Sequence, residues 1–110
     1  MDIRSIRRAL RHSLVVDAQV DNLDLEARIK GRSKDLNLYG CGVTTATPFS
    51  AGTRVMLMLA YGRKKITAFG KVIYGRPDIG MGIVFTIIEP DDQKVLEDWI
   101  AELATQESQS

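Results

Sequence analysis

The chain has 110 residues, of which 45% are hydrophobic and 26% are charged, and its formal net charge is +1. This length accommodates one domain with a modest core, and the composition is that of a folded globular protein rather than a disordered chain. A charge so close to neutral argues against a surface devoted to nucleic acid. The charge is unevenly spread, because residues 1–12 carry four arginines and one aspartate, a net charge of +3. The basic character is therefore an N-terminal feature.

The compartment is indicated by cysteine usage and by the absence of targeting patterns. Cys41 is the single cysteine, so an intramolecular disulfide is excluded and a reducing cytoplasm is expected. The basic N-terminal residues are not followed by the apolar core, about 7–15 residues long, of a secretory signal. The longest apolar run, residues 55–61, is far shorter than the roughly 20 residues of a membrane helix. We expect a cytoplasmic protein with no membrane partner.

The first two predicted strands form a hairpin. Residues 14–20 and 23–30 alternate between apolar and polar side chains, which is the period of a strand with one buried face. Asp21 and Asn22 between them suit a two-residue turn, since both residue types tolerate a positive φ. This turn pairs Val20 with Leu23 and every apolar residue of one strand with an apolar residue of the other.

The same register relates the N-terminal arginines to a short polar stretch further along the chain. Extended loosely toward the N-terminus, it gives two more pairs, Arg11 with Arg32 and Arg8 with Asp35. If residues 4–11 were helical instead, four arginines would share one helix face, namely Arg4, Arg7, Arg8 and Arg11. Either geometry concentrates arginine side chains next to a small polar turn.

The rest of the chain predicts more strands and then a helix. Four further strand candidates are residues 41–46, 53–61, 64–74 and 80–88. Six short strands separated by glycine and proline favour a mainly β fold, a small antiparallel barrel. After Glu89 the apolar residues recur at helical spacing, and Pro90 suits a first helical turn. Trp99 is expected to pack this helix on the barrel.

These elements give a simple organisation. We expect a basic N-terminal arm at residues 1–12, a six-stranded β-barrel at residues 13–88, and a C-terminal α-helix with a polar tail at residues 89–110. Catalysis is not predicted, because His12 and Cys41 have no evident third residue to orient them. A metal site lacks ligands, and no cofactor is expected.

The stretch SKDLNLYGCGV, residues 33–43, allows two interpretations. It is a tight turn between strands, or it is a place where a ligand approaches the backbone closely. Arginine binds phosphate bidentately and grips guanine O6 and N7. Asp35 can accept hydrogen bonds from the N1 and N2 edge of guanine, Asn37 can both donate and accept, and Gly40 leaves room for a purine. A ligand with guanine rings and two phosphates would use all of these groups.

The same residues resemble motifs of the PilZ domain family. RRALR, residues 7–11, fits the RxxxR element, and DLNLYG, residues 35–40, resembles the D/N-x-S-x-x-G element at the usual separation. GIVF, residues 82–85, followed by a C-terminal helix extends the resemblance over most of the chain. The overlapping RSIRR, residues 4–8, also satisfies RxxxR, although Arg11 lies nearer the first strand. The sequence differs at Asn37, where the family has serine.

The resemblance implies a fold, a ligand and a mode of action. PilZ domains are small β-barrels that bind the bacterial second messenger cyclic di-GMP. The implied ligand-binding residues are Arg7, Arg8, Arg11, Asp35, Asn37 and Gly40. The expected function is a receptor or adaptor, not an enzyme, in which ligand orders the arginine arm and presents a surface to a downstream protein partner. The alternative is a PilZ-fold interaction module that does not bind the nucleotide. A barrel that binds single-stranded nucleic acid ranks third, because few aromatic residues are available for stacking.

Overall fold

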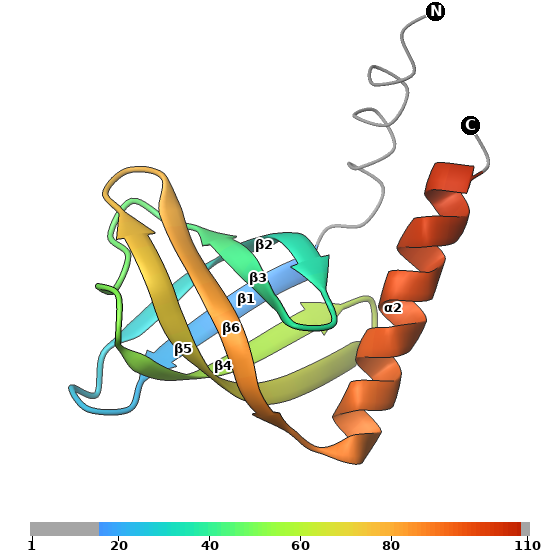
Figure 1. Ribbon diagram of the computed structural model, residues 1–110, viewed down its shortest axis with the longest axis horizontal. Helices are drawn as coiled ribbons and strands as arrows, with labels where there is room; N and C mark the ends of the chain where they lie inside the picture. Colours follow the sequence, from blue (N-terminus) through green and yellow to red (C-terminus); the bar gives the residue numbers. More distant parts are fainter. Residues whose placement is uncertain (1–15, 109–110) are drawn as a thin grey trace, which may run out of the picture.

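The computed structural model describes residues 16–108 and, at the C-terminal end, side chains as far as residue 104. Six strands are followed by one long helix (Figure 1). The elements are β1 (Val16–Asn22), β2 (Arg28–Asn37), β3 (Gly40–Thr44), β4 (Arg54–Tyr61), β5 (Lys64–Arg76), β6 (Gly80–Ile88) and α2 (Pro90–Ser108). The predicted arm at residues 1–12 lies outside the described residues.

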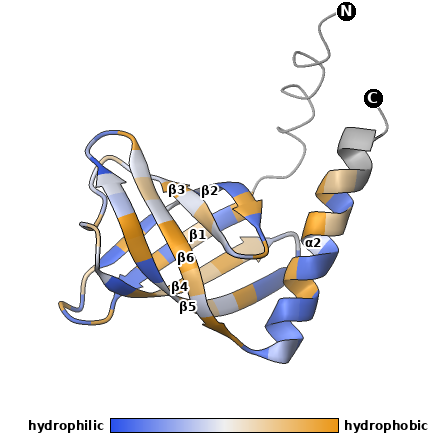
Figure 2. Ribbon diagram, viewed as in Figure 1, coloured by the Kyte–Doolittle hydropathy of each residue, from blue (hydrophilic) through white to orange (hydrophobic). Residues whose placement is uncertain are grey.

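The six strands form a closed antiparallel barrel in the order β1-β2-β3-β6-β5-β4. The barrel closes because β1 pairs with β4 as well as with β2. Buried and more exposed residues alternate along β1, β4 and β5. The ribbon in Figure 2 shows hydrophobic and hydrophilic residues along the same strands. The fold predicted from the sequence, a mainly β six-stranded barrel with a C-terminal helix, is confirmed.

The predicted register of the first hairpin is wrong. Val20 pairs with Ile29 rather than with Leu23, and Val16 pairs with Ser33. Arg32 pairs with Asp17, so the expected pairing of Arg11 with Arg32 is wrong too. The pairing of Arg8 with Asp35 loses its basis with the register, and Arg8 lies outside the described residues.

The side chain of Asn22 explains the error. Its Oδ1 accepts hydrogen bonds from the backbone N–H groups of Asp24 and Leu25, at 2.8 and 3.0 Å. Its own N–H donates to the carbonyl of Ala27 at 2.7 Å, and Glu26 has a φ of 52°. An Asn that bonds its following backbone in this way competes with strand formation. Residues 23–27 therefore form a loop, and Leu25 is 76% exposed.

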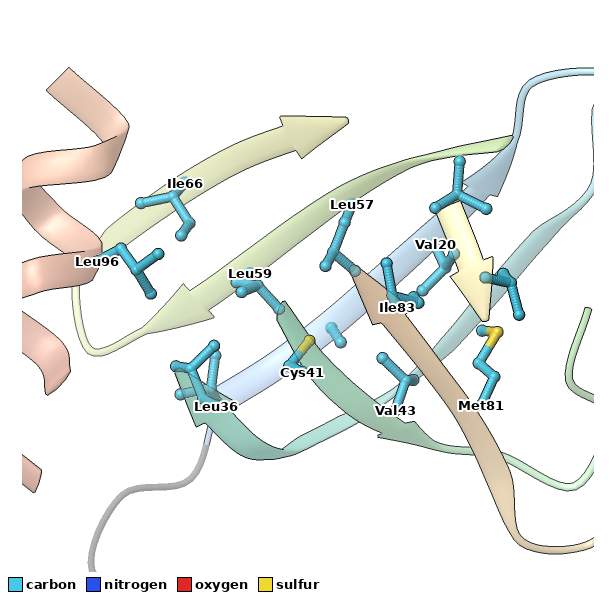
Figure 3. Close-up of a cluster of buried hydrophobic side chains, with 14 of the residues drawn as sticks. Val20, Leu36, Cys41, Val43, Leu57, Leu59, Ile66, Met81, Ile83 and Leu96 are labelled. Atoms are coloured by element: carbon cyan, nitrogen blue, oxygen red, sulfur yellow. The ribbon is translucent and has the colours of Figure 1, made fainter. Parts of the chain in front are cut away.

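The core fills the barrel and extends under the helix. Figure 3 shows inward side chains from the strands meeting Leu96 of α2, which is fully buried. Trp99 is 5% exposed, and its ring meets that of Tyr61 edge-on with centroids 5.9 Å apart. The prediction that Trp99 packs the helix on the barrel is confirmed. The helix continues to Ser108, into the segment predicted to be a polar tail.

Candidate ligand-binding site

The predicted ligand-binding turn is the connection between β2 and β3. Asn37 pairs with Gly40, and Leu38 and Tyr39 form the turn between them. The turn lies at the same end of the barrel as α2 in Figure 1. The pairing of β2 with β3 is irregular between Lys34 and Asn37, which is the position of a β-bulge.

The bulge turns Asp35 outward. In a regular strand, Ser33 and Asp35 would point to the same side, because side chains alternate with a period of two. Asp35 instead has a φ of 52°, a left-handed conformation that aspartate tolerates better than most residues. The alternation shifts by one residue, so Leu36 enters the core at 9% exposure while Asp35 and Asn37 are exposed. The irregularity therefore presents two polar side chains to solvent.

Asn37 holds this turn together with its side chain. Its Oδ1 accepts a hydrogen bond from the backbone N–H of Tyr39 at 2.8 Å. Its Nδ2 donates to the carbonyl of Asp35 at 3.4 Å, a long and weak contact. The turn interpretation of this stretch is thus correct for Asn37, and a serine hydroxyl could accept the same N–H. One Nδ2 hydrogen remains available to a ligand.

Gly40 has a packing reason of its own. The carbonyl oxygen of Ile83, on the neighbouring strand β6, occupies the space that a Cβ atom at Gly40 would need. The close approach anticipated at this residue is therefore made by β6, and room for a purine is not required to explain the glycine.

The carboxylate of Asp35 is exposed and has no ion-pair partner among the described residues. By contrast, Asp21 pairs with Arg28 at 2.8 Å and Asp24 with Arg54. An exposed carboxylate with free lone pairs can accept two hydrogen bonds from adjacent N–H groups of a ligand.

Strand β2 carries a row of basic side chains that ends next to Asp35. The outward residues of this strand, every second position, are Arg28, Lys30, Arg32 and Lys34. The last three form no ion pair in the described part of the chain. The alternation of basic residues at 28–34 indicates this feature in the sequence, but these residues were not among the predicted site residues. These side chains favour an anionic ligand near the turn.

The arginines implied by the family resemblance, Arg7, Arg8 and Arg11, lie outside the described residues. The structure shows where the N-terminal segment that carries these arginines joins the barrel. Val16, the first described residue, pairs with Ser33, two residues before Asp35. The N-terminal segment is thus covalently attached beside the turn.

Cys41 is a core residue. It is 6% exposed, and burial raises the pKa of its thiol to about 12. The nearby hydroxyl of Ser33 opposes this shift, yet Ser33 Oγ has no partner that meets hydrogen-bond geometry, so burial is the dominant effect. A thiol that stays protonated at neutral pH is a poor nucleophile. The prediction that Cys41 is a small packing residue is correct.

The described residues contain neither a metal-binding cluster nor a membrane-spanning helix. Over residues 16–108, no three His, Cys, Asp or Glu side chains gather as a metal site requires. No helix in the same range combines the length and apolar character needed to cross a bilayer.

The fold of this chain resembles two solved structures. The structure resembles the PilZ domain of CeSA from a cellulose-synthesizing bacterium, with a TM-score of 0.64, 20% identity, and coverage of 82% of this chain and 93% of that chain. It also resembles the Bacillus subtilis inhibitor of motility MotI/DgrA, with a TM-score of 0.63, 19% identity, and coverage of 83% and 48%. No curated protein sequence matches.

The family is established by sequence. The likeness to these solved structures concerns the fold of this chain, a small six-stranded barrel followed by a C-terminal helix. The model of the PilZ domain family matches residues 4–102, which is most of the chain. The chain therefore belongs to the PilZ domain family, a family of cyclic di-GMP receptors in which some members do not bind the nucleotide.

Proposed function

We propose that this protein is a cyclic di-GMP receptor with no enzymatic activity of its own. The observation that carries the proposal is that one family match, over residues 4–102, includes both the RxxxR element and the turn at residues 35–40. Either motif alone is weak, since arginines at helical spacing usually form a solvated face and an Asn-containing turn is common. Their joint occurrence on the PilZ barrel supports a shared ligand.

The geometry of the barrel supports the same proposal. Five peptide units separate Arg11 from Val16, so a fully extended chain spans at most about 18 Å between their Cα atoms. Because Val16 pairs with Ser33, this length brings Arg11 within reach of a ligand held at Asp35. The length of chain between Arg11 and Val16 is therefore short enough to keep the RxxxR element near the turn at residues 35–40.

Each group has a role that its chemistry fits. The exposed carboxylate of Asp35 accepts hydrogen bonds from N1–H and N2–H of a guanine. Arg7 and Arg11 bind phosphate oxygens or the O6 and N7 edge of guanine, and Arg8 adds positive charge. Arg32 and Lys34 on β2 raise the local potential for the two phosphates. The binding energy comes mainly from charge-assisted hydrogen bonds.

Binding would be coupled to a partner protein through the arm. Phosphates that neutralise the arginines hold residues 1–12 over the end of the barrel, and the arm and barrel then present a combined surface. Apolar side chains suitable for a protein contact are exposed on the barrel as well. Phe69 and Ile73 of β5 and Ile87 of β6 are 41%, 59% and 62% exposed.

Calorimetric titration of the full chain with cyclic di-GMP tests this function. GTP and a short single-stranded oligonucleotide serve as controls, since they share guanine or phosphate but not the cyclic dinucleotide. Saturable binding of cyclic di-GMP alone is the expected result. No binding of cyclic di-GMP would contradict the proposal, and tighter binding of the oligonucleotide would favour the nucleic-acid alternative.

A second candidate is a PilZ-fold interaction module that does not bind the nucleotide. Two observations favour it: Asn37 stands where the family has serine, and the exposed apolar residues of β5 and β6 are available without any ligand. The same titration separates the candidates, because a module of this kind releases no heat with cyclic di-GMP.

A further inference from the structure

Tyr39 is an exposed aromatic residue at the tip of the β2–β3 turn. Its side chain is 77% exposed, although a tyrosine ring loses favourable burial energy when it is left in water. Apart from Phe69 of β5, which is 41% exposed, the other aromatic rings of the described barrel have neighbours. Tyr61 meets Trp99, Tyr74 covers Gly82 and lies under Arg76, and Phe49 and Phe85 pack against the core.

The backbone of Tyr39 is held on both sides. Its N–H donates to Asn37 Oδ1 at 2.8 Å, and its carbonyl accepts from the N–H of Phe85 at 2.8 Å. The ring is therefore presented from a fixed point of the barrel. A group fixed in this way loses less conformational entropy when it binds a ligand than one on a free loop.

Asn37 also connects Tyr39 to Asp35. One amide side chain bonds the Tyr39 N–H through Oδ1 and the Asp35 carbonyl through Nδ2. The backbones of Tyr39 and Asp35 are thus linked through two hydrogen bonds to one amide group. The carboxylate of Asp35 and the ring of Tyr39 are both exposed within this turn and its bulge.

We propose that Tyr39 is a stacking residue of the nucleotide site, whose ring covers the face of the guanine that Asp35 binds by its edge. This inference rests on the proposed function. Asp35 would bind the edge of the base and Tyr39 its face, and together they select a planar base with adjacent N–H donors. Contacts to phosphate alone cannot distinguish one base from another. Stacking involves the aromatic ring of Tyr39 and not its hydroxyl group, so the hydroxyl stays hydrated when the ligand binds.

Titration of cyclic di-GMP into four variants tests the role of the ring. Base–aromatic stacking predicts that Tyr39→Ala and Tyr39→Leu weaken affinity by roughly 5- to 150-fold, while Tyr39→Phe stays within about twofold of wild type. Leu25→Ala is the matched control. Leu25 is 76% exposed in the β1–β2 loop at the other end of the barrel, and its loss leaves affinity unchanged.

A fluorescence measurement gives a second readout. With Tyr39→Trp, stacking of guanine on the introduced indole quenches its emission as ligand is added, whereas buried Trp99 contributes a constant background. All variants melt at the wild-type temperature, because the replaced side chains are exposed.

Each outcome is decisive. Wild-type affinity in Tyr39→Ala overturns the stacking role and leaves the proposed receptor function standing. Equal losses in Tyr39→Phe and Tyr39→Ala assign the contact to the hydroxyl and also overturn it. Absence of binding by the wild-type chain overturns both the inference and the proposed function.

Discussion

Gly40 of β3 lies against the carbonyl oxygen of Ile83 in β6, with no room for a Cβ atom between them. Gly40→Ala should therefore lower the free energy of unfolding by at least about 1–3 kcal/mol, the usual cost of overpacking. Urea denaturation measures the change. Gly42→Ala is the control, because its Cβ would lie 3.0 Å from two carbons of the Lys34 side chain, which can move aside. Equal losses in both variants would contradict the role of the Ile83 contact.

The arginine assignments predict a loss of affinity without a loss of fold. Arg7→Ala and Arg11→Ala should each weaken cyclic di-GMP binding by a few kcal/mol, because each removes a charge-assisted bidentate contact. Titration calorimetry measures the change, and Arg63→Ala in the exposed β4–β5 turn is the control of equal charge. Binding should also weaken as salt rises, through screening of the phosphate contacts. Wild-type affinity in either variant would remove that arginine from the site.

Asn37 has a turn role and a proposed ligand role, which substitutions can separate. Asn37→Ser should keep or improve affinity, since a hydroxyl can still accept the Tyr39 N–H. Asn37→Leu removes the acceptor and should nearly abolish binding, with a loss of stability of about 0.5–1.5 kcal/mol. Asn37→Asp keeps the acceptor but loses the Nδ2 donor, and it should bind weakly. If all these variants bound the nucleotide equally, position 37 would act only in the turn.

The buried thiol of Cys41 predicts a pH dependence of stability. Burial raises its pKa from 9.0 to about 12 in the folded chain. Between these two pH values the unfolded chain loses the thiol proton and the folded chain retains it, so stability falls as pH rises. Urea denaturation at several pH values from 8 upward measures this, and Cys41→Ala isolates the contribution from other titrating groups. A pH slope that is identical in wild type and Cys41→Ala would refute it.

The proposed coupling predicts a pattern of amide hydrogen exchange. Residues 5–12 carry three arginines and a histidine beside three apolar side chains, so they should exchange rapidly in the absence of ligand and slowly once cyclic di-GMP is bound. Protection should also rise at residues 35–42, while Trp99 and α2 change little. Slow exchange of residues 5–12 without ligand, or fast exchange at saturation, would exclude the ordering mechanism even where binding occurs.

The strands and the helix could be predicted because their patterns are local. Alternation with a period of two, interrupted by glycine and proline, located five of the six strands, and a period of 3.6 located α2. The second strand was predicted at residues 23–30, whereas β2 covers Arg28–Asn37. The register of β1 with β2 could not be predicted in this way. Val20 pairs with Ile29 instead of Leu23, and this displacement of six residues, an even number, leaves the alternation between inward and outward positions unchanged. Alternation alone is therefore compatible with both registers, and the turn formed by Asn22, which leaves Leu25 exposed, decides between them.

The sequence predicted which residues belong to the candidate site, but it did not predict how they are arranged in space. The sequence placed Asp35 and Asn37 together but gave no indication of the bulge that turns Asp35 outward and Leu36 inward. It also gave no reason to single out Tyr39, whose exposure depends on where the turn projects. The close packing at Gly40 involves Ile83, which is distant in the sequence. Contacts of this kind depend on the closed barrel as a whole.

The closure of the barrel limits how a partner can dock. Because β1 bonds to β4 on one side and to β2 on the other, every strand of the described barrel has two neighbours. A partner therefore finds no strand of the described barrel whose whole edge is unpaired and open to an additional strand. Recognition of the proposed partner would then depend on side chains, and Phe69, Ile73 and Ile87 are exposed apolar side chains of the barrel. Point substitutions on the outer surface can then change which partner is recognised while the hydrogen-bonded framework stays the same.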